Sequence, residues 1–475
     1  MPNIPTTPRA DSSVALPRST ARGIDILLAA LVLLVIVVHP MTSLGISLAW
    51  LGRLLGFGEK IVEKAPRLTL ADVFIWLAGG LLLLRIVLRR DFRSLRRLPL
   101  AAVVLVLLGA LSMLFARNKL TAIADVVQYF EYFIVFYLAV VTVLTTKERL
   151  RLAVLLWLLV GSAVVLWGLI HYLTASRDAL HVSGPFLNRN VFSGYLAMLL
   201  PLSWGLMLHS RSVSAIVQSV VLAILALVVM LAGGPWLAAL IGLAVITVAR
   251  TPKLFPLFAA GLLVLVIAVF PALPRDNARI LATSLYPFDE TQNAVTPDQP
   301  VPATGFVEAW RLSPRYIEWQ AAAKFLTPSA YRELGMSRAE HTRQLLLGVG
   351  IGNYQWNIGR YYGFLPKPNA NTTEPDTNNL YLVLAMSVGL PAALTFLWLV
   401  GTFLRRAVSA RVEARDDFLR GLFLGSAGAL TSLLVTNVFT QTLVHGSGPA
   451  MILLFGFAQA GSRLLERTSL DDSTS

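Results

Sequence analysis

Long apolar runs separated by short polar connections dominate this chain of 475 residues. A helix needs about 20 mainly apolar residues to cross a bilayer, and lipid satisfies no backbone polar groups outside a helix or a closed barrel. We therefore expect an all-α fold: a polytopic membrane protein of about twelve transmembrane helices, with one long extracytoplasmic loop that contains short helices. The predicted spans are about 24–41, 70–88, 98–116, 122–143, 150–173, 190–208, 213–232, 235–249, 254–272, 378–404, 418–443 and 447–462.

These spans divide the chain into five regions. The regions are a cytoplasmic tail at 1–22, nine spans within 23–272, an extracytoplasmic loop at 273–377, three spans within 378–462, and a second cytoplasmic tail at 463–475. The first apolar run follows a polar leader, but no small-x-small cleavage site comes after it. We therefore expect this run to remain as a helix rather than to be removed as a signal peptide.

The charge pattern predicts the orientation. Only 14% of the residues are charged, whereas a soluble domain has about 25%, and the net charge is +14. Basic residues concentrate in alternate connections, such as 89–97, 147–151 and 405–415, which places those connections and both termini in the cytoplasm. The long loop carries equal numbers of basic and acidic residues. The positive charge therefore indicates membrane orientation, and no nucleic-acid partner is expected.

Two residue types limit the chemistry. The chain has no cysteine, which excludes disulfides, thiolate nucleophiles and zinc–thiolate sites. Its six histidines are scattered without a close pair, so no metal site and no cofactor are predicted. His171 and His445 fall near outer span ends, where we expect interfacial positions.

The fourth span contains two acidic residues, Asp125 and Glu131. Asp125 lies near the start of the span, where an interfacial position explains it. Glu131 lies deeper, and charges inside a membrane are costly and often functional. We expect Glu131 to be buried and paired with an arginine from another span.

The long loop divides into two parts. Its first part is rich in Pro and Asp without an apolar period, which predicts irregular structure. In the second part, Tyr316, Trp319, Ala323 and Leu326 follow a helical spacing. This part predicts one or two helices that lie at the outer membrane surface.

Polar groups stand at the outer ends of two spans. The sixth span begins within GPFLNRNVFSGYLAMLLPL, where Asn188, Arg189 and Asn190 precede the apolar run. A helix N-terminus has free N–H groups and partial positive charge, so an anion could bind there. An ordinary N-cap explains the asparagines equally well. The tenth span begins after TEPDTNN, where Asp376 or Thr377 can cap a second outward-facing N-terminus.

Two further motifs lie in the loop. In SPRYIEWQAAAKF, Arg315 could bind phosphate oxygens through its planar guanidinium, or could form a surface ion pair with Glu318. In LLLGVGIGNYQWNIGRYYG, alternating glycines indicate a tight turn or a close backbone approach. The aromatic residues that follow could lie in the membrane interface or stack on sugars.

In this order, these motifs resemble those of the O-antigen ligase and O-antigen polymerase superfamily of bacterial membrane proteins. The resemblance covers most of the chain and includes the long outer loop between the ninth and tenth spans. The family commonly opens the tenth span with His-Asn, nine residues, Gly, two residues and a small residue. Here the matching positions are Asn378-Asn379, Gly389, Leu390-Pro391 and Ala392.

The resemblance implies an activity. Such proteins transfer a glycan from undecaprenyl pyrophosphate to a hydroxyl of lipid A core, another glycan or a protein, without a metal or nucleotide. It also implies a location in the plasma (inner) membrane of a bacterium, with the active site outside. The residues implied to bind the donor or acceptor are Asn188, Arg189, Asn190, Arg315, Trp319, Arg360 and Asn379.

The chain departs from the family pattern at two places. Asn378 occupies the usual histidine position, and Gly233-Gly234-Pro235 replaces a Ser-Arg-Gly motif. Three hypotheses follow. The chain is a transferase in which Asp376 or His341 assists at the Asn378 position, a transporter-like member linked to inorganic-carbon uptake, or a non-catalytic partner of envelope-glycan enzymes.

Overall fold

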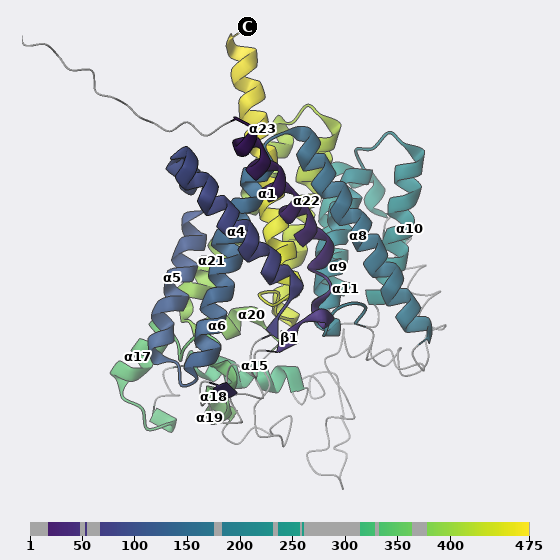
Figure 1. Ribbon diagram of the computed structural model, residues 1–475. Coiled ribbons are helices and arrows are strands. Elements are labelled where there is room, and N and C mark those ends of the chain that lie inside the picture. Colours follow the sequence, from purple (N-terminus) through teal and green to yellow (C-terminus); the bar gives the residue numbers. More distant parts are fainter. Residues whose placement is uncertain are drawn as a thin grey trace, which may run out of the picture.

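The computed structural model describes residues 18–47, 53–54, 67–174, 183–230, 236–256, 259–260, 314–327, 332–362 and 378–474 (Figure 1). Within these residues the chain forms a bundle of helices. The strands found there are two residues long: β1 (Ile46–Ser47) pairs antiparallel with β2 (Arg67–Leu68). The all-α class predicted from the apolar runs is confirmed.

The bundle is built from helices of very different lengths. The longer ones are α1 (Arg18–Val38), α4 (Leu70–Arg89), α5 (Leu100–Ser112), α6 (Lys119–Phe130), α8 (Lys147–Thr174), α9 (Arg189–Met207), α10 (Val213–Met230), α11 (Trp236–Arg250), α21 (Leu390–Glu413), α22 (Asp417–Phe439) and α23 (Ser447–Thr474). The shorter ones are α7 (Tyr137–Val143), α15 (Pro314–Lys324), α17 (Arg338–Leu347), α18 (Tyr354–Asn357), α19 (Gly359–Tyr362) and α20 (Leu380–Ser387). A π-helical segment, η4 (Glu131–Phe136), joins α6 to α7, and the 3-10 turns are η1 (Thr42–Leu44), η2 (Phe92–Arg97), η3 (Met113–Phe115) and η6 (Pro252–Leu254).

Length and composition identify membrane helices among these elements. Six are long and apolar enough to cross a bilayer: Leu70–Arg89, Lys119–Val143, Lys147–His171, Arg189–Met207, Leu390–Glu413 and Asp417–Phe439. Leu100–Phe115 and Trp236–Arg250 are apolar but shorter. The chain is thus a multi-pass membrane protein, and the number twelve stays a prediction. The predicted ninth span, 254–272, lies largely outside the described residues.

The tenth predicted span is not one helix, so the prediction of a continuous helix over 378–404 is wrong. The chain leaves α20 at Val388 and begins α21 at Leu390, with Gly389 between them at φ +108°. Residues with a side chain rarely adopt this conformation. A Cβ at Gly389 would also lie 2.3 Å from the carbonyl oxygen of Leu346 in α17. Only glycine therefore fits at the break, where the backbone approaches α17, and Pro391 in the first turn of α21 suits the start of the new helix.

Small residues let the central helices approach closely. A Cβ on Gly205 of α9 would lie 2.3 Å from the backbone nitrogen of Gly425 in α22. A Cβ on Gly242 of α11 would lie 2.7 Å from the carbonyl oxygen of Gly428, also in α22. Such pairs are typical of membrane helix packing, where lipid provides no hydrophobic drive between helices. They place α22 at the centre of the bundle.

The bundle has two unlike ends. The helices α15, α17, α18 and α19 cover one end, which we call the loop end (Figure 1). Helix α1 begins and α23 ends at the opposite end, which we call the C-terminal end (Figure 1). Basic connections meet at the C-terminal end: Lys147 lies 2.6 Å from Asp416, and Arg467 donates to the carbonyl of Thr145. The side of the membrane on which this end lies stays a prediction.

Candidate functional site at the loop end

The glycine-rich motif of the loop closes the gap left by the break after α20. The N–H of Val349 donates to the carbonyl of Met386, and that of Gly350 to the carbonyl of Ser387, both at 2.9 Å. These are among the last carbonyls of α20, which a helix end leaves without partners. Gly348 is at φ +69°, and a Cβ there would lie 2.2 Å from the Ser387 oxygen. The glycines thus permit a close approach of backbone to backbone.

The other side of this turn is anchored to the junction between α5 and α6. The N–H of Ile351 donates to Ser112 Oγ at 3.1 Å. The fully buried side chain of Asn353 accepts from the N–H of Asn118 at 2.6 Å and donates to the Asn118 carbonyl at 3.0 Å. The glycine turn therefore joins the α20–α21 break to the start of α6.

A cavity of about 470 Å³ lies beside this junction. Its wall is made by α6, the chain from Ile351 to Trp356, α20, and the connection 440–446 between α22 and α23. The lining is mixed rather than apolar. Its polar and aromatic side chains include Asp125, Gln128, Tyr129, Tyr354, Gln355, Trp356 and Gln441.

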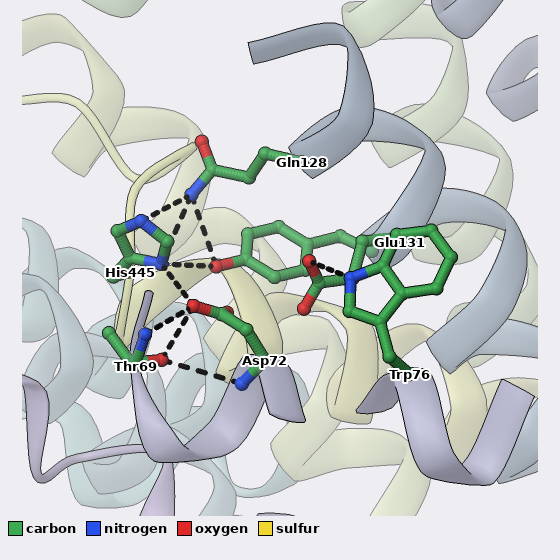
Figure 2. Close-up of polar contacts among 7 residues, drawn as sticks. Thr69, Asp72, Trp76, Gln128, Glu131 and His445 are labelled. Carbon is green, nitrogen blue, oxygen red and sulfur yellow. Dashed lines mark hydrogen bonds and ion pairs between the residues drawn. The ribbon is translucent and has the colours of Figure 1, made fainter. Parts of the chain in front are cut away.

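Gln128 connects the cavity wall to a buried polar cluster (Figure 2). Its amide nitrogen donates to the Tyr132 hydroxyl at 3.2 Å and lies 3.3 Å from His445 Nδ1. The Tyr132 hydroxyl lies 3.1 Å from the same ring nitrogen, and Asp72 Oδ2 lies 3.4 Å from it. His445, predicted to be interfacial, is thus bonded into a cluster supplied by three separate segments.

Asp72 owes its position to the start of α4. It forms a capping box with Thr69: the Thr69 N–H donates to Asp72 Oδ2 at 2.7 Å, and the Asp72 N–H donates to Thr69 Oγ1 at 3.4 Å. The positive end of the helix dipole favours a carboxylate there. Asp72 is only 2% exposed. The Thr-x-x-Asp spacing is visible in the sequence and could have identified this cap.

Glu131 opens the π-helical segment η4, and such segments are frequent at functional sites. The side chain is 4% exposed and accepts from Trp76 Nε1 at 3.1 Å (Figure 2). Burial was predicted correctly, but the expected arginine partner was wrong. The groups that contact its carboxyl among the described residues are Trp76 and Asp72.

The asparagines of the span starts are helix caps. Asn188 Oδ1 accepts from the N–H of Asn190 at 2.7 Å at the start of α9, and Asn379 Oδ1 accepts from the N–H of Leu382 at 3.1 Å at the start of α20. Asn378 is half-buried beside Asn379. Leu380, the residue after them, lines the cavity, but these two asparagines are not among its described lining residues.

The remaining predicted site residues lie elsewhere. His341 is buried in α17, where Nε2 lies 3.1 Å from the Phe325 carbonyl. Arg360 donates to Asn357 at 3.0 Å, and the Trp319 ring packs 6.2 Å from that of Phe439. Asp376 and the side chain of Arg315 lie outside the described residues.

The structure therefore brings together two of the predicted motifs and leaves a third apart. The glycine turn and α20 line one cavity, whereas Arg189 and its neighbours at the start of α9 are not among its described lining residues. The start of α9 still lies beside the 440–446 connection, because a Cβ on Gly446 would meet the Phe186 ring at 2.8 Å.

No protein-family model and no curated protein matches the chain. The features that point to a function are the cavity at the loop end and the polar cluster that adjoins it.

Proposed function

We propose that this protein transfers a glycan from undecaprenyl pyrophosphate to an acceptor hydroxyl of lipid A core, another glycan or a protein, on the outer face of the bacterial plasma membrane. In this proposal the loop end is outside and both termini are cytoplasmic. One observation carries it: the glycine turn and α20, two of the segments on which the family resemblance rests, line the same mixed polar and aromatic cavity.

The lining of the cavity suits a sugar. Asp125, Gln128 and Gln355 offer acceptors and donors to ring hydroxyls, and Tyr129 and Trp356 offer aromatic faces. A volume of about 470 Å³ lies within the usual range of ligand sites. Because the cavity lies at one end of a membrane bundle, a lipid-linked donor could place its glycan there while its tail stays in the bilayer.

The reaction would proceed by substitution at the anomeric carbon. The acceptor oxygen forms a bond to that carbon, the bond to the pyrophosphate oxygen breaks, and the acceptor proton passes to a base. The N-terminus of α20, capped by Asn379, would stabilise charge on the leaving pyrophosphate together with Arg315 of α15. As the base, we favour Asp125, which lines the cavity, over His341, which is buried in α17.

The test is glycan transfer in cells that lack the native gene and express Asp125→Asn, Gln128→Ala or Trp356→Ala. We expect Asp125→Asn to reduce transfer by roughly 100-fold or more, as the loss of a general base does. Asp417→Asn is the matched control, since Asp417 lies at the C-terminal end in an exposed pair with Arg211. Unchanged glycan profiles for all three cavity variants, at normal protein levels, would overturn the proposal.

A second candidate, transport linked to inorganic-carbon uptake, is favoured by the buried carboxyls of Asp72 and Glu131. Ionisable residues within a membrane often mark ion or proton paths. Uptake into proteoliposomes that is abolished by Glu131→Gln, with glycan transfer absent, would favour transport. Tight binding of the lipid carrier with neither activity would instead favour a non-catalytic partner.

A further inference from the structure

The carboxyl groups of Asp72 and Glu131 meet inside the bundle. They come from α4 and η4, are 2% and 4% exposed, and adjoin each other in the polar cluster (Figure 2). Two acidic side chains in such close contact repel each other if both are ionised, and burial strengthens the repulsion.

One oxygen of each carboxyl accepts at least one hydrogen bond. Asp72 Oδ2 accepts from the N–H of Thr69 at 2.7 Å and from its hydroxyl at 2.9 Å, and Glu131 Oε2 accepts from Trp76 Nε1 at 3.1 Å. The other two oxygens, Asp72 Oδ1 and Glu131 Oε1, are buried without a donor among the described residues. A buried acceptor that lacks a donor is costly and uncommon in folded proteins.

The surrounding elements do not compensate for two negative charges. The titratable groups that face the pair are His445, from the connection before α23, and Tyr132, from η4. Neighbouring α5 has no charged residue, and no Lys or Arg contacts either carboxyl within the described part of the chain. His445 could offset at most one of the two charges.

A single proton resolves both difficulties. Two ionised carboxylates offer only acceptors, so they can form a hydrogen bond with each other only when one of them is protonated. That proton gives the pair a donor that it otherwise lacks and halves the charge of the pair. We infer that Asp72 and Glu131 hold one proton between them, and that this buried pair is a proton-binding site.

The site has a connection to solvent. The His445 ring is 27% exposed, lies 3.4 Å from Asp72 Oδ2, and also contacts Gln128 at the cavity wall. The imidazole could therefore pass a proton between the pair and the cavity. The inference stands independently of glycan transfer, because it concerns the charge of the pair and not the reaction in the cavity.

Infrared spectroscopy of the purified full-length protein in lipid nanodiscs tests this inference. We expect the carbonyl band of a buried protonated carboxylic acid at neutral pH, with a shift in D₂O. Glu131→Gln and Asp72→Asn should each abolish the band. Glu148→Gln is the matched control, since Glu148 is a fully exposed glutamate in the first turn of α8, and should leave the band unchanged.

The thermal unfolding temperatures of Glu131 variants provide an independent test of the shared proton. The amide of Glu131→Gln can accept from Trp76 and donate to the Asp72 carboxylate, so this variant should unfold at or above the wild-type temperature at neutral pH. Glu131→Ala leaves Trp76 and Asp72 without that partner and should unfold lower. No protonated-carboxyl band in the wild type, or a band that persists in both Glu131→Gln and Asp72→Asn, would overturn the inference. If one of these variants does not fold, the other still decides.

Discussion

The two ends of the bundle each contain a cavity, and the two cavities differ in kind. The cavity at the C-terminal end has a volume of about 610 Å³ and combines leucines with charged residues that pair with each other, Lys147 with Asp416 and Arg211 with Asp417. The cavity at the loop end, of about 470 Å³, is lined by carboxamides and aromatic rings and adjoins a buried polar cluster. The cavity at the loop end is therefore the better candidate for an active site, although the cavity at the C-terminal end is larger.

The two ends differ in how deeply their polar groups are buried. The charged pairs that line the cavity at the C-terminal end are at least partly exposed: Arg211 has 91% of its side chain in contact with solvent, and Lys147 has 45%. Such pairs contribute about 0–1 kcal/mol to stability, and here they suit the orientation of a protein in a membrane. At the loop end Asn353 is fully buried and joined to Asn118. The loss of one partner in such a pair costs about 1–3 kcal/mol. Equivalent substitutions should therefore cost more at the loop end.

The largest effect should come from Gly350→Ala in the glycine turn. Gly350 is at φ +107°, and a Cβ there would lie 2.3 Å from the backbone of Ala116, which cannot move aside easily. Strain and overpacking together should cost about 3 kcal/mol or more. The measurement is thermal or denaturant unfolding of the purified protein in detergent.

Gly401→Ala is the control for that substitution. Gly401 lies within α21, and a Cβ there meets nothing within 4 Å. Alanine should stabilise this helix position by up to about 1 kcal/mol. Equal stability of the two variants would show that the close backbone contact at Gly350 does not contribute to stability.

Asn353→Ala should lower the free energy of unfolding by less than Gly350→Ala does. It removes the acceptor of the Asn118 N–H and the donor to the Asn118 carbonyl, both in a buried site, so we expect a loss of about 2–3 kcal/mol. Asn190→Ala is the matched control, because the half-buried Asn190 side chain makes no hydrogen bond within the described residues, and it should change stability by less than about 0.5 kcal/mol. Similar losses for both would contradict the contrast between buried and surface polar groups.

The sequence could predict features that depend on neighbouring residues, but not features that depend on contacts between distant segments. Helices follow from apolar runs that are local in the chain, so most of the predicted spans begin within a few residues of a described helix, although α23 continues twelve residues beyond the predicted end of its span. The break at Gly389 is different. Pro391, in the first turn of α21, is a local signal for a helix start, but the close approach of Gly389 to the carbonyl of Leu346 in a distant helix cannot be read from the sequence.

The polar cluster was only partly predictable for a related reason. Glu131 was noticeable as a charge inside an apolar span. Its neighbours Asp72 and His445 come from α4 and from the connection before α23, which are far away in the chain. Helix packing alone brings them together, and no spacing in a single sequence encodes that contact. The prediction that an arginine would neutralise Glu131 was wrong because the partner that the fold places there is a second acid.

The smallest effect is expected at Asp416 in the C-terminal end, where an ion pair and a helix cap can be separated. Burial acts to raise the pKa of this carboxyl, but the hydrogen bonds from Lys147 and from the N–H of Leu419 outweigh it, so the pKa lies below its ordinary value. The stabilisation is thus complete above the ordinary Asp pKa and is lost as the pH falls through the lower folded-state value.

Asp416→Asn keeps a capping oxygen for the N–H of Leu419 but loses the ion pair with Lys147. It should therefore lower the free energy of unfolding by less than about 1 kcal/mol at neutral pH, and should have no effect below the folded-state pKa of Asp416. Asp416→Ala also loses the cap of α22, and should cost about 1 kcal/mol more, in acid as well as at neutral pH. Unfolding curves of both variants, from neutral pH to below the pKa of Asp416, measure the contributions of the ion pair and of the helix cap. A loss of stability in Asp416→Asn that does not vary with pH would mean that the carboxylate acts through its shape and not through its charge. The difference in stability cost between polar groups at the two ends would then be smaller than proposed.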